Sequence, residues 1–186
     1  RRIWSQPAVV GAHLNRMQLD AMESWAVALL LSNVVSRDAN LSLDEGTEKQ
    51  LTVRFQQMGK AVEGLETIDY QLGLFDGLPQ PTQDRLLART VGDADAAAGK
   101  FDKLVAAWAA GDTDAVALYA DSELRAVEGL SGALLTDRNR QWATWLQNRL
   151  ARPGTILVAV GAGHLVGTDS VQAMLEAQGV PVKRVQ

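Results

Sequence analysis

Apolar residues recur every three or four positions along most of the chain. Leu19, Met22, Trp25 and Leu29 form one such series. This spacing places the apolar side chains on one face of an α-helix. It predicts helices over residues 15–36, 43–58, 67–75, 82–91, 96–109, 113–120, 137–150 and 168–177.

Capping residues support several of these boundaries. Thr67 and Asp95 have side chains that accept hydrogen bonds from the first turn of a helix, and both precede predicted helices. Gly59 is a suitable residue just beyond the end of a helix, and Pro153 follows the helix over 137–150.

Three short segments have the pattern of β-strands: residues 61–66, 155–160 and 180–185. The segment 155–160 is a continuous apolar run with β-branched residues, which is typical of a buried parallel strand. With the helix over 168–177 and the last segment, it predicts a right-handed β-α-β unit. The expected fold is α/β and helix-rich, a single domain over residues 1–186 in which helices flank a small, mainly parallel sheet.

Three strands barely make a sheet, because a buried parallel strand needs neighbours on both edges. We therefore expect the missing neighbours to come from strands N-terminal to this sequence or from a second copy of the chain.

Composition narrows the classes of function. Of 186 residues, 47% are hydrophobic and 22% charged, which indicates a globular protein. The net charge of -4 argues against nucleic acid as a partner. There is no cysteine, so disulfides and thiolate ligands are excluded. The longest apolar run is too short to span a membrane.

A histidine in a glycine-rich turn is the strongest candidate for chemistry. Gly161, Gly163 and Gly167 surround His164, directly after the strand over 155–160. Ligands gather at the carboxyl ends of strands in α/β sheets, and imidazole binds transition metals. By position alone, a metal ligand and a locally hydrogen-bonded histidine are equally supported.

The same glycines partly match a dinucleotide-binding loop, but the next strand carries Lys183 and Arg184 where that motif has an acidic residue. The other histidine, His13, precedes a helix and fits a surface or capping role.

Polar residues at element boundaries are further candidates. Glu66 ends a predicted strand, so its carboxylate is a candidate metal ligand or general base. Arg138 and Asn139 open the helix over 137–150, where they could reach an oxyanion or a substrate carbonyl. Solvated surface side chains are the alternative for each. No Gly-x-Ser-x-Gly motif supports a serine hydrolase of the α/β type.

Several segments together resemble the TraB/GumN family, which is similar to the Tiki metal-dependent proteases. The resemblance lies in their order and spacing over almost the whole chain: residues 46–48, 60–67, 74–78, 137–143 and 153–165.

The resemblance implies a metal-dependent, peptidase-like hydrolase built around two Gly-x-x-His motifs, acting on a peptide or a small molecule. The second motif falls on Gly161 and His164, which makes His164 a ligand of a divalent transition metal. The resemblance adds Glu48 as a metal-site residue and Glu66, Arg138 and Asn139 as catalytic residues. It also implies an exported bacterial protein.

The first Gly-x-x-His motif has no match in residues 1–60. We therefore expect this chain to lack the N-terminal strands and half of the metal site, and to be inactive by itself. The alternative is a non-catalytic helical interaction module of the same family.

Overall fold

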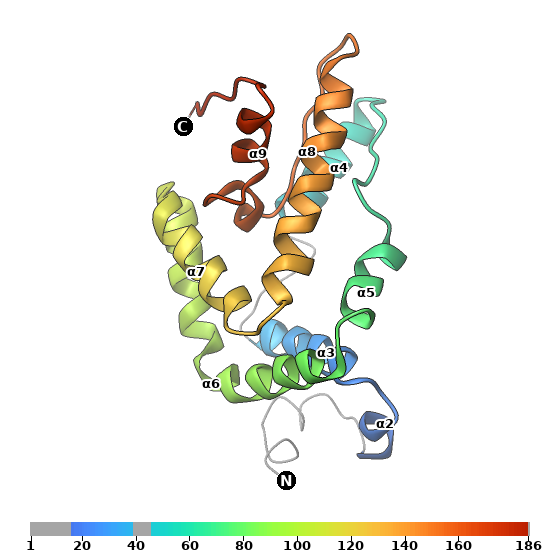
Figure 1. Ribbon diagram of the computed structural model, residues 1–186, viewed down its shortest axis with the longest axis vertical. Coiled ribbons are helices and arrows are strands. Elements are labelled where there is room, and N and C mark those ends of the chain that lie inside the picture. Colours follow the sequence, from blue (N-terminus) through green and yellow to red (C-terminus); the bar gives the residue numbers. More distant parts are fainter. Residues whose placement is uncertain (1–15, 39–45, 186) are drawn as a thin grey trace. The chain divides into compact units, whose positions relative to one another are not determined.

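The computed structural model describes residues 16–38 and 46–185, and every regular element in them is helical (Figure 1). The chain divides into two compact units, residues 1–102 and 103–186.

The described residues of the first unit form four helices and most of a fifth. Its aromatic pair, Trp25 and Phe75, stacks with ring centroids 6.1 Å apart. The helices are α2 (Arg16–Asp20), α3 (Ser24–Asp38), α4 (Thr47–Gln57), α5 (Ile68–Asp76) and α6 (Gln80–Ala110), of which α6 continues into the second unit.

The core of the first unit lies between the early helices and α6. Leu19, Val27, Leu31 and Val91 form a buried cluster. Removing these side chains from water is the main favourable term in the packing of this unit. Beside the cluster, the Ser24 hydroxyl donates a hydrogen bond of 2.6 Å to the Asp84 carboxylate, which joins α3 to α6.

The second unit carries the C-terminal helices. The elements are α7 (Thr113–Arg125), the π-helical turn η3 (Gly132–Thr136), α8 (Asp137–Leu150), the 3₁₀ turn η4 (Ala162–Leu165) and α9 (Val171–Ala177).

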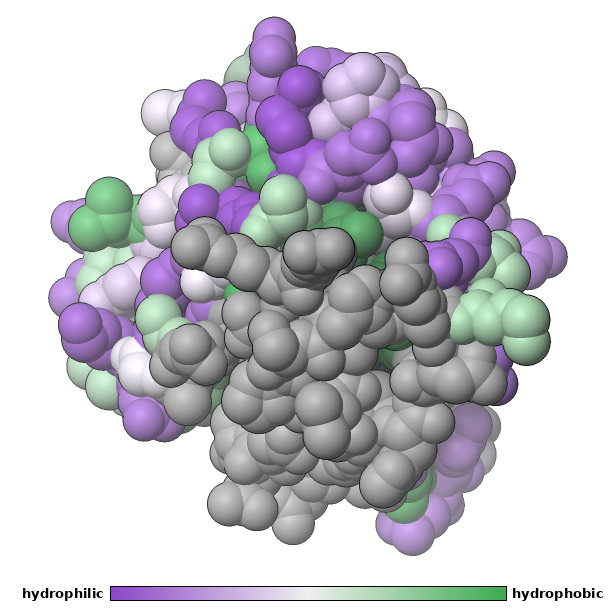
Figure 2. Space-filling view, turned by 90° about the horizontal axis from the view of Figure 1, so that it is seen from below, coloured by the Kyte–Doolittle hydropathy of each residue, from purple (hydrophilic) through white to green (hydrophobic). Residues whose placement is uncertain are grey.

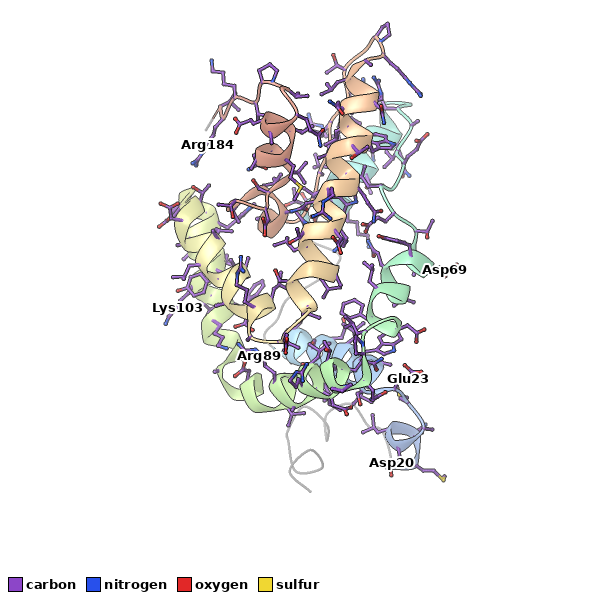
Figure 3. All side chains as sticks on the ribbon, in the orientation of Figure 1. Asp20, Glu23, Asp69, Arg89, Lys103 and Arg184 are labelled. Carbon is purple, nitrogen blue, oxygen red and sulfur yellow. The ribbon has the colours of Figure 1, made fainter. Side chains whose placement is uncertain are left out.

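Within the second unit, α8 packs against α9 and η3, and η4 packs against α7 (Figure 1). The buried side chains include Val127, Trp142, Val171 and Leu175. The guanidinium of Arg184 donates a hydrogen bond of 2.8 Å to the carbonyl of Gly111, so the C-terminal segment is tied to the start of α7 (Figure 3).

The predicted α/β fold is wrong for the described residues, which contain no strand and therefore no parallel sheet and no β-α-β unit. Segments 61–66, 155–160 and 180–185 have no regular structure. The run over 155–160 is also not buried, since Leu157 is 57% exposed. A strand is stabilised by hydrogen bonds to a neighbouring strand, and no described segment supplies one.

The observed helices agree with the helices predicted from the apolar spacing much better than the observed structure agrees with the predicted strands. The helix over 137–150 is confirmed as α8, and Thr67 is the N-cap of α5 as predicted. The helices expected over 82–91 and 96–109 are one continuous helix, α6, so the N-cap predicted at Asp95 is wrong. Helix α9 begins at Val171, three residues after the predicted start at residue 168, and its N-cap is Ser170.

Two surface features bear on partners. None of the helices in the described ranges has both the length and the apolar character of a membrane span. On the face shown in Figure 2, the visible described residues are mainly polar, with apolar residues scattered among them.

Candidate functional site

His164 lies in η4, the short helical turn between the extended segment 155–160 and α9. Its imidazole is half-buried and faces α8, where it meets Asn139 and Trp142. The histidine is therefore placed by contacts between η4 and α8, and not by the end of a strand.

The side chain of Asn139 holds the imidazole in one orientation. Its amide nitrogen Nδ2 donates a hydrogen bond of 2.6 Å to the carbonyl of Asp169. Because that carbonyl can only accept, the Asn139 oxygen Oδ1 must face the other way, and it lies 2.6 Å from Nδ1 of His164. An amide oxygen accepts only, so Nδ1 of His164 carries a proton, and in the neutral ring Nε2 then carries the lone pair.

Asn139 is fully buried, with 0% of its surface exposed. A buried amide whose two ends are both hydrogen-bonded is costly to disturb, because either partner would be left without a bond. Asn139 is therefore a rigid support for the His164 ring.

An aromatic ring contacts the same imidazole, and a cationic group contacts that ring in turn. The Trp142 ring lies 4.5 Å from the His164 ring, centroid to centroid, with the planes tilted by 48°. The Arg138 guanidinium lies 4.9 Å from the centre of the Trp142 ring, a cation–π contact. Its Nη1 donates to the Leu134 carbonyl. The first half of α8 thus lines one side of His164.

The loop before α9 is fixed at several points. The Thr136 hydroxyl donates a hydrogen bond of 3.3 Å to the Asp169 carboxylate. Ser170 caps α9 by accepting from the amide of Ala173. Gly167 has φ +78°, a left-handed backbone that favours glycine. This loop holds in place the carbonyl to which Asn139 is bonded.

A hollow of about 360 Å³ opens on the other side of this loop, beside α7. At its narrow side, a Cβ on Gly163 would lie 3.3 Å from Cβ of Ala120. Its lining is mostly small and apolar, with two charged residues: Ala117, Leu118, Ala120, Arg125, Leu135, Gly163, Val166, Gly167, Thr168 and Asp169.

The sequence-predicted site residues are divided between the two units. His164, Arg138 and Asn139 are brought together in the second unit, along with Gly161 and Gly163. Gly161 faces the imidazole, since a Cβ there would lie 3.8 Å from Cδ2 of His164.

Glu48 and Glu66 belong to the first unit. Glu48 is exposed in the first turn of α4. Glu66 accepts a hydrogen bond of 3.1 Å from the side chain of Gln71. His13 lies outside the described residues.

No three histidine or acidic side chains in the described ranges cluster closely enough to hold a metal ion. His164 suits one coordination position, because metal-bound histidines usually donate their second ring N–H to an oxygen acceptor. The described residues do not complete the ligand set.

Sequence reasoning missed Thr136, Asp169 and the contact of Trp142 with the imidazole. Trp142 is buried, with 6% of its surface exposed. No local signal identifies Asp169, because its backbone carbonyl, and not its side chain, supports Asn139.

The second unit is thus a helical unit with one histidine held in a single tautomer by a buried amide. Residues 6–184 match the TraB/PrgY/gumN family, and the chain belongs to that family. Searches among curated proteins and among solved structures gave no match.

Proposed function

We propose that this protein is a metal-dependent, peptidase-like hydrolase in which Nε2 of His164 is a metal ligand. The observation that carries the proposal is the pair of 2.6 Å hydrogen bonds made by Asn139. They support the tautomer with the proton on Nδ1, which is the form in which a neutral imidazole binds a metal through Nε2.

The neighbours of His164 have distinct roles in this proposal. Asn139 is a positioning residue, since its amide is fully engaged with the ring and with the Asp169 carbonyl. Arg138 is half-buried and carries a positive charge on the same side of α8, which suits the stabilisation of a substrate carbonyl or oxyanion.

The metal, a divalent transition ion, would supply Lewis-acid polarisation of the substrate and of a bound water. The family resemblance supports Glu48 as a second ligand and Glu66 as a general base. The described residues provide only part of the ligand set of this metal.

A non-catalytic interaction module is the second candidate function. In the described part of the chain, it is favoured by regular elements that are all helical and by the lack of a three-residue metal-binding cluster. The two candidates differ in whether the protein takes up metal through His164.

Calorimetric titration of the full chain with Zn²⁺ distinguishes them. The expected result is saturable uptake that His164→Ala abolishes and His13→Ala preserves, since the sequence has only these two histidines. In the full-length protein, metal-dependent peptide cleavage should be lost in the same variant. Equal Zn²⁺ uptake by the protein and by His164→Ala would refute the hydrolase proposal and favour the interaction module.

A further inference from the structure

The hollow between α7 and the loop 163–169 lies outside the contacts of the His164 ring, which faces α8. Its volume of about 360 Å³ is in the range of small-ligand sites in proteins, roughly 300–1,000 Å³. We propose that this hollow binds a small organic cation, namely a primary ammonium group attached to a short apolar body.

The side chains that line the hollow determine how large and how apolar the uncharged part of the ligand can be. Ala117, Ala120 and Val166 contribute short side chains, and the buried Leu135 adds a further apolar surface. Such a surface favours a methyl or a short aliphatic group over a long or polar one, because it offers few hydrogen-bonding groups.

Asp169 supplies the charge that selects a cation. Asp169 is half-buried. Its carboxylate accepts a hydrogen bond of 3.3 Å from the hydroxyl of Thr136, the residue just before α8. Arg125 also lines the hollow, but it is exposed in the last turn of α7. A half-buried charge held in place is screened less by water and salt than an exposed one. The Asp169 carboxylate therefore contributes more to the electrostatic potential in the hollow than the Arg125 guanidinium does.

The test is an NMR titration of the isotope-labelled full chain, without metal and at mildly acidic pH. The probe is L-alaninamide, which carries an ammonium group and a methyl group. N-acetyl-L-alaninamide is the neutral comparison with the same side chain. We expect saturable shifts of the Gly163, Thr168 and Asp169 amides with the cation and none with the neutral amide.

Asp169→Asn should weaken the binding of L-alaninamide about tenfold or more, because a charge-assisted hydrogen bond is lost. Asp114→Asn is the matched control, since Asp114 is exposed on α7 outside the lining. Ala117→Leu fills the hollow with Asp169 intact and should also abolish binding.

His164→Ala should leave the binding of L-alaninamide unchanged, so this result is independent of the proposed hydrolase activity. The proposal is overturned if L-alaninamide gives no saturable shifts, if the neutral amide binds equally well, or if Asp169→Asn binds as the unmodified protein does.

Discussion

At the scale of single residues, the buried amide of Asn139 determines which nitrogen of the neutral His164 ring carries the proton. The sequence identified both residues as candidates but gave Asn139 a role at the substrate. In the structure, both ends of that amide are occupied, one by the Asp169 carbonyl and one by the imidazole. Two polar residues that the sequence marks as candidates can therefore be one metal-ligand candidate and one residue that supports it.

Replacement of Asn139 by leucine should lower the free energy of unfolding by about 2–4 kcal/mol, because the Asp169 carbonyl and Nδ1 of His164 would lose their partners. Urea denaturation measures this difference. Asn148→Leu is the control, since Asn148 is exposed on the same helix, and its effect should be within about 0.5 kcal/mol. Equal effects of the two substitutions would show that the buried amide contributes nothing specific.

At the scale of elements, polar contacts determine how neighbouring helices are joined. In the first unit, Asp84 of α6 accepts hydrogen bonds from Ser24, at the start of α3, and from Gln80. The hydrogen bond from Ser24, and then that from Gln80, hold the pKa of the Asp84 carboxyl below its ordinary value of 3.8.

This lowered pKa predicts a pH-dependent contribution to stability. A carboxyl with a lower pKa in the folded state stabilises the protein above its unfolded pKa, and the contribution is lost as the pH falls through the folded pKa. Ser24→Ala should therefore reduce the thermal unfolding temperature slightly at neutral pH. The difference should disappear below pH 3.8 as the Asp84 carboxylate is protonated.

Ser32→Ala is the control for this pH dependence, because the Ser32 hydroxyl bonds the Ala28 carbonyl, which does not titrate. If the unfolding temperature of Ser24→Ala stays below that of the unmodified protein by the same amount throughout the acidic range, the pH dependence does not come from Asp84.

The elements also show what the sequence could and could not predict. Helix α8 and the cap at Thr67 follow from local signals, namely apolar spacing and a hydroxyl that accepts from the first turn. The continuity of α6 past Asp95 does not, since that potential cap lies within a helix whose hydrogen bonds compete with capping.

At the scale of the whole molecule, the sheet was the part of the fold that local pattern could not predict. β-branched residues in segment 155–160 indicate an extended backbone, but a sheet also requires a partner strand at the right place. That partner is a long-range property of the chain, and none of the described segments provides it.

Some residues of the candidate site could be predicted from local sequence patterns, but the long-range contacts between them could not. The glycine-rich turn marked His164, and the start of α8 marked Asn139, but only the tertiary fold of the second unit brings these side chains, 25 positions apart in sequence, to 2.6 Å. Thr136 and Asp169 act through hydrogen bonds across 33 positions of sequence, for which no spacing rule exists.

The tautomer of His164 tests the central claim most directly. A long-range proton–nitrogen NMR spectrum, recorded where the imidazole is neutral, distinguishes the two ring nitrogens. The account predicts a proton on Nδ1 and a lone pair on Nε2 of His164, with loss of this preference in Asn139→Leu. A neutral ring protonated on Nε2 in the unmodified protein would contradict it, because that nitrogen could then not bind a metal.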